Sequence, residues 1–554
     1  MEKKFNLLDE PWILAMDGEG QTCKLSLIEV LVRAHELRGL AGEMPTQDAA
    51  ILRLLVAVLY GAFGREELPE HEVDEWDGVA AMDRWQWLWG QRCLPEDILR
   101  RYLAPYHERF YLVHPTQPFY QAAFPGDKVQ DSQGNTYVPG EMSTQFMIGT
   151  LSESENKPCL FRSRAREDGL AFDEAARWLV HLNAFDVAPT GAPPRGVIKV
   201  NGYSSAWLCK VGVLYAQGDT LFQALLLNLV FEGKGGEVFT TAPDSLYWEM
   251  EHVHDGDDLK DITLPLPSSP GQLYSQPFRL LQLQTQEDRV VGYRRWTGWK
   301  YEGFPNVEVM TAWREGKKNE PPSPKRHNSE RMMWRDLPGI LAMKGDQESC
   351  LIVQWLIALR RTRNADSPPL PRPRLCAVGM QLDSKGASVE SVFFDTLSLN
   401  ASLLEGLDQT VVTRLENLLA TTEKCVWAIG LLAKNLSLAA GDSGKSPGEG
   451  AAAAGKGEAY FALDMPFRDW LVDLAPNAVD NDTMDAAEVQ WVDTLERILT
   501  NLAQQWVSGA GETALIGRTV DGELYSAPKA MILFRGILRK TLHPNQTKEG
   551  GKQS

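Results

Sequence analysis

The chain has 554 residues, which is too long for a single hydrophobic core, so we expect two or more domains. Its formal net charge of -18 argues against a protein that binds nucleic acid over its whole surface, because lysine and arginine dominate the affinity for phosphate. Its seven cysteines include no Cys-x-x-Cys pair and no apolar run approaches the roughly 20 residues of a membrane span, so we expect a cytoplasmic protein without a zinc knuckle or a disulfide framework.

The N-terminal segment is predicted to form a β-hairpin. Residues Phe5 to Ile13 indicate a short strand that enters a turn, since Pro11 cannot donate to a β-ladder. The dipeptide Asp17-Gly18 is typical of a hairpin turn, and the chain returns over Cys23 to Leu25. These features alone indicate only the edge of a domain that mixes strands and helices.

From there to about residue 400, helices alternate with short strands and loops. Ser26 is a candidate N-cap for a helix to Leu37, and a more apolar helix is predicted over Ala49 to Phe63. A third helical pattern covers Phe172 to Phe185. Prolines predict a loop over Thr190 to Gly196 and an exposed loop over Lys317 to Ser329. We therefore expect a mixed domain over residues 1–400.

Beyond Asn400 the pattern is helical throughout. Apolar stripes indicate helices around Leu404 to Cys425, Trp491 to Trp506 and Met531 to Leu542, with a shorter one over Tyr460 to Leu474. Gly441 to Gly457 is predicted to be a flexible connector. The expected fold is α+β: a large mixed N-terminal domain followed by a C-terminal four-helix bundle over residues 401–545, with residues 546–554 as a disordered tail.

The motifs of common enzymes are missing from the sequence. The Gly-Lys-Ser at the end of Gly441 to Ser446 follows its first glycine too closely for a phosphate loop, and no predicted strand precedes it. His252, His254 and Asp257 offer metal-ligand atoms, but one short polar loop rarely closes a four-ligand site. We therefore assign no catalytic residue, metal site or cofactor. The alternative that stays open is a metal-dependent nuclease or hydrolase centred on these three residues.

Two blocks in order resemble a known family. Phe5-Asn6-Leu7-Leu8-Asp9-Glu10-Pro11-Trp12-Ile13 resembles the start of the CasA family, the large subunit of the type I-E CRISPR Cascade surveillance complex. Phe110 to His114, running on to Pro118 to Gln121, resembles that family's next recognisable segment. The resemblance implies a non-catalytic subunit in antiviral defence. Its implied partners are guide RNA, the other Cascade subunits, target double-stranded DNA and a helicase-nuclease.

The resemblance also implies how the subunit reads DNA. In the CasA family a lysine finger, a glycine loop and an amide-bearing wedge recognise a protospacer-adjacent motif (PAM) from the minor groove, and the wedge helps to part the strands as the R-loop begins. Guide pairing reads the rest of the target, which is the general division of labour in RNA-guided systems. Minor-groove readout is degenerate, so several flanking motifs are tolerated.

The residues that match these features are carried over by position. Those expected to recognise the flanking motif are Lys317 and Lys318 as fingers, Arg314 in support, Gly191 in the glycine loop, and Lys385 and Gly386 at the wedge. Those expected to dock on the complex and guide RNA are Phe161, Arg162 and Arg164. Those expected to hold the displaced strand are Lys529, Arg535, Arg539 and Lys540.

This chain departs from the family pattern at two of these features. The glycine loop has one glycine and two prolines, and Lys385 and Gly386 stand where the family has asparagine and glutamine. Either Gln381 serves as the amide, or this chain parts the strands with a different chemistry.

Plainer interpretations stay open for each of these segments. The segment with Phe161 would be a plain surface loop, and Lys317 and Lys318 would form a solubilising hairpin tip. The loop with Gly191 would be a rigid connector, and the basic residues from Lys529 to Lys540 would complement a helix dipole. A purely structural scaffold whose basic loops contact only protein is the remaining alternative for the whole chain.

Overall fold

The computed structural model describes most of the chain. The described residues are 2–121, 129–130, 136–137, 140–148, 169–187, 205–250, 263–295, 300–301, 303–314, 316, 320–341, 350–362, 367–384, 386, 388–405, 409–443, 445–474 and 481–544. The chain divides into two compact units: Met1–Arg331 with Lys344–Thr396, and Met332–Met343 with Leu397–Ser554. Each unit is described by itself.

The first unit begins with a small sheet that confirms the predicted hairpin. Strands β2 (Ile13–Asp17), β3 (Thr22–Leu25) and β4 (Leu37–Leu40) form a sheet in the order β3-β2-β4. The Asp17 carboxylate accepts hydrogen bonds from the backbone N–H groups of Glu19 and Gln21, which closes the turn. β1 (Lys4–Asn6) pairs with β5 (Tyr111–Val113) nearby in the fold.

Helix α1 (Leu27–Val32) begins as predicted but ends early. Ser26 and Glu29 form a reciprocal capping box at its start. The predicted end at Leu37 is wrong, because Leu37 is fully buried in β4, where it pairs with Asp17. Tertiary pairing therefore overrides the helical pattern after Val32.

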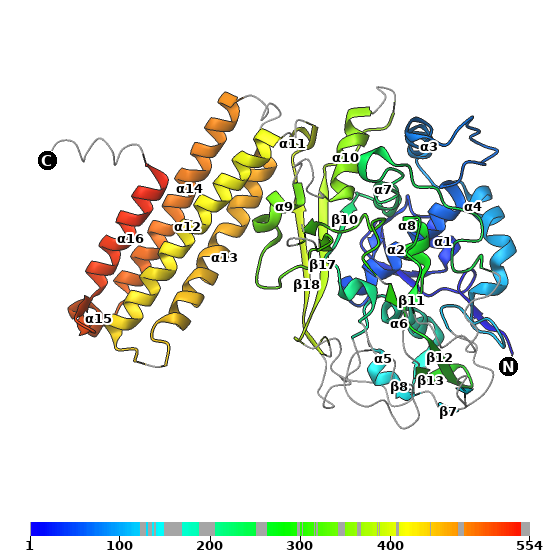
Figure 1. The fold of residues 1–554 in the computed structure, drawn as a ribbon, viewed down its shortest axis with the longest axis horizontal. Coiled ribbons are helices and arrows are strands. Elements are labelled where there is room, and N and C mark those ends of the chain that lie inside the picture. The colour runs from blue at the N-terminus through cyan, green and yellow to red at the C-terminus, as the bar shows by residue number, and fades with distance from the viewer. Residues whose placement is uncertain are drawn as a thin grey trace. The chain divides into compact units, whose positions relative to one another are not determined.

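Helix α2 (Pro45–Phe63) is the central helix of the first unit (Figure 1). It begins four residues before the predicted start, because Pro45 suits the first helical position. It is the single described helix long and apolar enough to cross a membrane, yet 94% of its most apolar window is buried inside the protein. Its neighbours in the fold include α6 (Phe172–Ala184), which confirms the predicted helix there, and α8 (Pro270–Ser275).

Two larger sheets and several short pairs complete this unit. One sheet has the order β12-β13-β8, with β9 also paired to β13, and the other has the order β10-β17-β18. The strands are β8 (Gly140–Ser143), β9 (Leu170–Ala171), β10 (Val213–Gln217), β12 (Leu281–Gln286), β13 (Arg289–Arg295), β17 (Arg374–Leu382) and β18 (Val389–Ser398). The short pairs are β6 (Val129–Gln130) with β7 (Thr136–Tyr137), β11 (Thr263–Leu264) with β14 (Lys300–Tyr301), and β15 (Trp313–Arg314) with β16 (Ser323–Pro324).

Further helices surround these sheets. They are α3 (Gly78–Gly90), α4 (Glu96–Leu103), α5 (Thr144–Met147), α7 (Leu221–Leu227) and α10 (Leu351–Thr362). The 3-10 turns of this unit include η1 (Ala104–Phe110), η2 (Trp207–Cys209) and η3 (Lys234–Gly236). The mixture of helices with mainly antiparallel strand pairs confirms the α+β class.

The second unit is built on a four-helix bundle, which confirms the predicted architecture. Its long helices α12 (Gln409–Ala440), α13 (Glu449–Asp473), α14 (Asn481–Ser508) and α16 (Ala527–Leu542) run side by side (Figure 1). Shorter elements accompany them: η5 (Met333–Asp336), α9 (Leu337–Leu341), α11 (Ala401–Glu405), α15 (Glu512–Ile516), and the pair β19 (Arg518–Val520) and β20 (Glu523–Tyr525).

The segment with η5 and α9 comes from earlier in the sequence but packs in the bundle. The Trp334 ring stacks on Phe467 at 4.5 Å between centroids, and its indole N–H donates to Asp464 at 2.9 Å. The Arg335 guanidinium lies 3.6 Å from the centre of the Tyr460 ring. These contacts explain why residues 332–343 belong to the second unit.

The connector predicted over Gly441 to Gly457 is shorter than expected. Helix α13 begins at Glu449, so the second half of that segment is helical. Residues Ala451 to Ala454 supply the strongest helix formers, which outweigh the glycines beside them. Gly455 packs where an added Cβ would lie 2.8 Å from Ala433 and 3.0 Å from Trp506, so this glycine allows close approach between helices.

A candidate nucleic-acid interface

A groove of about 890 Å³ opens on the first unit, and cationic and aromatic side chains make up much of its lining. We call it the cationic groove. Its cationic residues are Lys210, Arg314, Lys325 and Arg326, and its aromatic residues are Trp207, Phe278, Tyr301 and Phe304. Ser205, Gly303, Ser323 and Pro324 complete it. Cations beside aromatic rings are the combination that binds nucleic acid through phosphate contacts and base stacking.

Short elements from distant parts of the sequence bring the cations together. Arg314 lies in β15, where its guanidinium donates to the Ser323 hydroxyl of β16 at 2.8 Å. The Arg326 guanidinium donates to the backbone carbonyl of Lys210, which follows η2, at 3.4 Å. Gly212 permits this arrangement, because an added Cβ would lie 2.7 Å from the carbonyl oxygen of Lys325.

The groove carries four cationic side chains. Burial, together with the nearby cations Arg279 and Arg326, lowers the pKa of Lys210 to about 8. Within the part of the chain that the structure describes, Lys210, Arg314 and Arg326 form no ion pair with a carboxylate. The groove therefore holds a local positive field in a chain whose total formal charge is -18.

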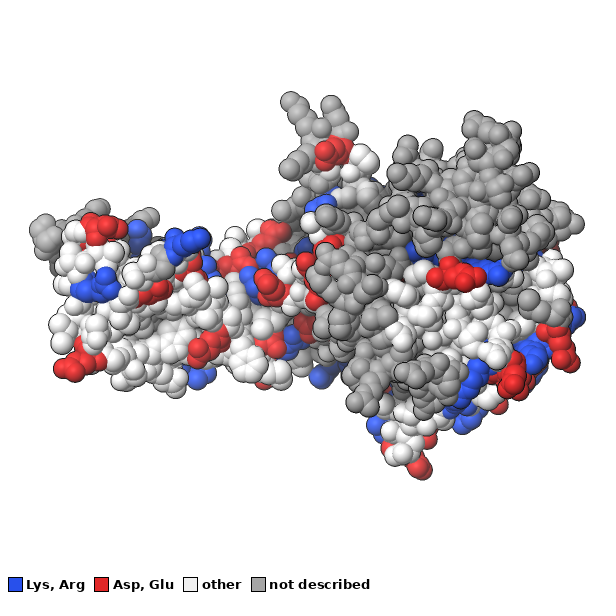
Figure 2. Space-filling view, turned by 90° about the horizontal axis from the view of Figure 1, so that it is seen from below, with Lys and Arg blue, Asp and Glu red and all other residues white. Residues whose placement is uncertain are grey.

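Figure 2 shows one face of the molecule. Basic and acidic side chains are interspersed over the coloured residues of that face. This pattern agrees with the expectation that contacts with nucleic acid are local.

The aromatic residues form one connected cluster. The Trp207 ring lies 6.1 Å from Tyr301 and 6.3 Å from Phe304 between centroids, and Phe278 lies 5.3 Å from Tyr301. Trp207 and Phe278 are buried, whereas Phe304 is 39% exposed. Phe304 is thus the ring that the cluster presents to solvent.

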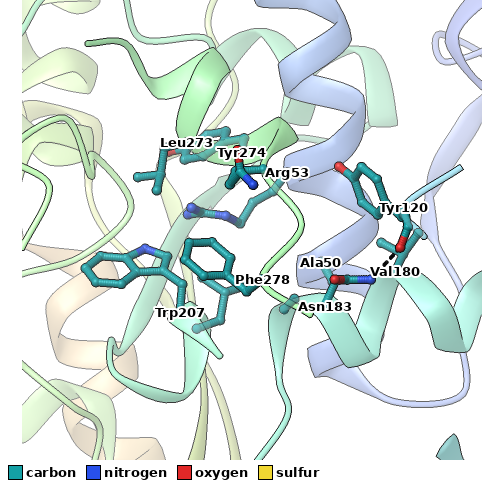
Figure 3. Close-up of a pocket in the computed structure, with 12 residues that line it drawn as sticks. Ala50, Arg53, Tyr120, Val180, Asn183, Trp207, Leu273, Tyr274 and Phe278 are labelled. Atoms are coloured by element: carbon teal, nitrogen blue, oxygen red, sulfur yellow. Dashed lines mark hydrogen bonds between the residues drawn. The ribbon is translucent and has the colours of Figure 1, made fainter. Parts of the chain in front are cut away.

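A small cavity of about 30 Å³ lies behind the groove and shares Trp207 and Phe278 with it (Figure 3). Its lining includes Arg53 of α2, whose guanidinium lies 3.7 Å from the centre of the Tyr274 ring. Arg53 forms a two-point ion pair with Glu308 at 2.8 and 2.9 Å. Burial would lower the pKa of Arg53, but Glu308 outweighs that effect and the pKa is raised.

Glu308 connects this buried pair to the groove. Its carboxylate accepts hydrogen bonds from the Trp207 indole N–H at 2.6 Å and from the Met310 backbone N–H at 3.1 Å. Trp207 forms part of the aromatic cluster, and Met310 precedes β15 with Arg314. The ion pair between α2 and the Glu308 segment therefore positions both sides of the groove.

A second buried ion pair holds the chain that leaves α6. Asp186 accepts from the Arg279 guanidinium at 2.5 Å, and Arg279 also donates to the backbone carbonyls of Asp186 and Val187. Arg279 is next to Phe278 in the sequence, so this pair fixes the aromatic cluster as well.

Of the residues predicted to recognise a flanking motif, the structure places Arg314 in the groove. Lys317, Lys318, Gly191 and Lys385 lie outside the described residues. Gly386 lies in the turn between β17 and β18 with a φ of 69°, and it does not line the groove. The neighbouring strands β17 and β18 thus form a hairpin at the position where the wedge is expected.

The alternative amide, Gln381, is already engaged in β17. Its side chain accepts from the Ser329 hydroxyl at 2.8 Å and donates to Glu390 at 3.2 Å. Whether it serves as the wedge stays a prediction.

The predicted docking residues Phe161, Arg162 and Arg164 lie outside the described residues, as do His252, His254 and Asp257. Among the residues that the structure describes, no group of three or more His, Cys, Asp or Glu side chains is arranged to hold a metal ion.

The basic residues predicted to hold a displaced strand lie exposed on α16. They are Lys529, Arg535, Arg539 and Lys540, and they flank the core-facing stripe of buried side chains Met531, Phe534 and Leu538. Arg539 and Lys540 lie in its last turn, where they also complement the helix dipole.

The sequence placed Lys325 and Arg326 only within the loop predicted over Lys317 to Ser329, and it gave no signal for Lys210, Trp207 and Phe304. Lys210 is an isolated lysine with no local basic pattern, and more than 90 residues separate it from Phe304. A tryptophan or phenylalanine in an irregular segment also gives no periodic signal.

Comparison with known proteins gives the family. The model of the family described as CRISPR-associated protein Cse1 matches residues 6–502. A curated protein of Thermus thermophilus, described as CRISPR-associated protein CasA/Cse1, is 29% identical over 358 residues, which cover 62% of this chain and 61% of that protein.

Solved structures agree with this match. The structure of Thermobifida fusca Cse1 has a TM-score of 0.76 and 28% identity, with 98% of each chain covered. A chain in a structure described as a CRISPR RNA-guided surveillance complex has a TM-score of 0.63 with 18% identity, over 97% of this chain and 100% of that chain, and it shows a shared fold. The resemblance to CasA is confirmed: the chain belongs to the CRISPR-associated protein Cse1 family.

Proposed function

We propose that this chain is the large subunit of a type I-E CRISPR RNA-guided surveillance complex and that it binds nucleic acid through the cationic groove. Membership of the Cse1 family supports the first part, together with the shared fold of a chain in a surveillance complex. The observation that carries the second part is the groove itself, where Arg314 lies with Lys210 and Arg326 and none of the three is paired to a carboxylate in the described structure.

In this proposal the subunit recognises a protospacer-adjacent motif in duplex DNA from the minor-groove side. Arg314 lies at the end of β15, and Lys317 and Lys318 follow it within four residues. A lysine ammonium is compact enough to enter a narrow groove and meet the acceptors of the base edges. The hairpin of β17 and β18 is a rigid element that helps to part the strands.

The remaining parts of the proposed function concern partners. The subunit docks on guide RNA and the other Cascade subunits through Phe161, Arg162 and Arg164, and it recruits the helicase-nuclease that degrades the target. Lys529, Arg535, Arg539 and Lys540 hold the displaced strand. The chain has no catalytic role of its own in this scheme, and the complex works in the cytoplasm.

Charge reversal tests this proposal. Lys317→Glu with Lys318→Glu, introduced into the assembled complex, should weaken binding to duplex DNA that carries the flanking motif by about tenfold or more. Arg92→Glu with Lys234→Glu changes the net charge equally at exposed positions outside the groove and serves as the control. Binding that responds equally to both pairs of substitutions, or to neither, would contradict the proposal.

A further inference from the structure

Phe304 is an unusual residue to find at the rim of a cationic groove. It is a large apolar side chain with 39% of its surface exposed, and it lies between the exposed Gly303 and the buried Pro305. The buried Trp207 ring backs it at 6.3 Å between centroids, with 47° between the ring planes. The outer face of Phe304 is therefore supported from behind and available to a ligand.

The cations beside Phe304 favour an anionic ligand. Burial and the neighbouring cations Arg279 and Arg326 destabilise the charge of Lys210 and lower its pKa to about 8. A phosphate placed between Lys210, Arg314 and Arg326 would relieve that repulsion, because none of the three has a carboxylate partner in the described structure.

An aromatic face and a phosphate site in one groove together fit a nucleotide. The bases of an intact duplex are stacked on their neighbours, so their faces are not available to a protein ring. An unpaired base offers its face, and every base stacks on aromatic side chains because each has a π-surface. The groove volume of about 890 Å³ lies within the range of sites that enclose small organic ligands.

We propose that the cationic groove binds an unpaired nucleotide, with the base stacked on Phe304 and the phosphate held by Lys210, Arg314 and Arg326. This inference rests on the proposed function, in which the same groove binds nucleic acid. It adds that the bound nucleic acid is single-stranded. The unpaired nucleotide comes either from a DNA strand released from the target duplex or from guide RNA. Both present the same base and phosphate chemistry.

Oligonucleotide binding to the full-length chain tests the stacking. The probes are a 12-nucleotide DNA, an RNA of the same sequence and a DNA duplex, each fluorescently labelled. Low salt strengthens the contacts between phosphate and the groove cations. Phe304→Ala should weaken binding of the single strands about 5- to 150-fold, which is the range expected for loss of one stacked base. Phe304→Trp should restore it. Phe461→Ala, at a phenylalanine that is 78% exposed on α13, is the matched control and should change nothing.

A spectroscopic readout separates stacking from folding. A 2-aminopurine base in the DNA probe should lose fluorescence when the wild-type chain binds it and keep that fluorescence with Phe304→Ala. Tighter binding of the DNA would identify the source as a released strand, and tighter binding of the RNA would identify guide RNA. Thermal unfolding of the Phe304→Ala variant checks that it still folds.

The outcomes distinguish this inference from the proposed function. Unchanged single-strand binding by Phe304→Ala, or an equal loss for single strands and duplex, would overturn the inference while the groove remained a nucleic-acid site. The proposed function would instead be overturned if Lys317→Glu with Lys318→Glu weakened binding of the motif-bearing duplex by the assembled complex no more than the control pair does.

Discussion

Replacing Glu308 with glutamine should destabilise the first unit by about 3–5 kcal/mol, the usual cost of removing one partner from a buried ion pair. The side chain of Arg53 is 5% exposed and that of Glu308 is not exposed at all. Glu308 accepts from both ends of the Arg53 guanidinium, from Trp207 and from Met310. A glutamine amide turns one of these acceptor positions into a donor that faces other donors, and it leaves the Arg53 charge buried without compensation.

A surface pair with the same geometry provides the control. Arg101 forms a two-point ion pair with Glu70 at 2.6 and 2.8 Å, but their side chains are 53% and 29% exposed. Glu70→Gln should therefore cost far less stability than Glu308→Gln, because solvent screens an exposed pair. The comparison isolates burial as the cause, since the two pairs share their chemistry.

Denaturant unfolding of the full chain measures the free energy of unfolding of both variants, and calorimetry provides a second measurement. The double variant Arg53→Met with Glu308→Gln should be more stable than Glu308→Gln alone, because it removes the uncompensated cation. The reasoning is refuted if Glu308→Gln lowers the stability no more than Glu70→Gln does. It is also refuted if the double variant loses the sum of the stabilities lost by Glu308→Gln and by Arg53→Met alone. Glu308→Gln should also weaken nucleic-acid binding, since Trp207 and the Arg314 strand lose their shared support.

Two further predictions depend on pH. Burial lowers the pKa of His181 to about 3, and its ring nitrogen lies 3.0 Å from the Thr46 hydroxyl. The unfolded chain takes up this proton near pH 6.5 whereas the folded chain does not, so stability is constant above that pH and falls toward pH 3 by on the order of 4 kcal/mol. His181→Gln should flatten this slope in unfolding curves measured between pH 7 and pH 4, and an unchanged slope would contradict the assignment. For Lys210, whose pKa is lowered to about 8, nucleic-acid binding should weaken between pH 7 and pH 9 as the ammonium loses its proton. In Lys210→Arg this weakening should disappear when binding of the labelled oligonucleotide is followed by fluorescence anisotropy. If binding by the variant weakens as much as binding by the wild type, Lys210 is not the group that titrates.

The sequence by itself determined the elements whose signals lie within a few residues. Ser26 marked the start of α1, the apolar period indicated α6 and the bundle helices α12, α14 and α16, and Asp17-Gly18 indicated the first turn. The two N-terminal blocks identified the family, and the resemblance directed attention to Arg314. These features depend on local backbone preferences and on short residue patterns, so they can be recognised without knowledge of the fold.

Only the tertiary structure decided which distant residues meet. Arg53 and Glu308 are 255 positions apart, and the groove joins Trp207 and Lys210 to Phe304 and Arg326. The end of α1 and the packing of Trp334 in the bundle were also decided by contacts between remote segments. Burial, ion pairing and ring stacking act through space, and a single sequence records the residues that take part in them but not their partners.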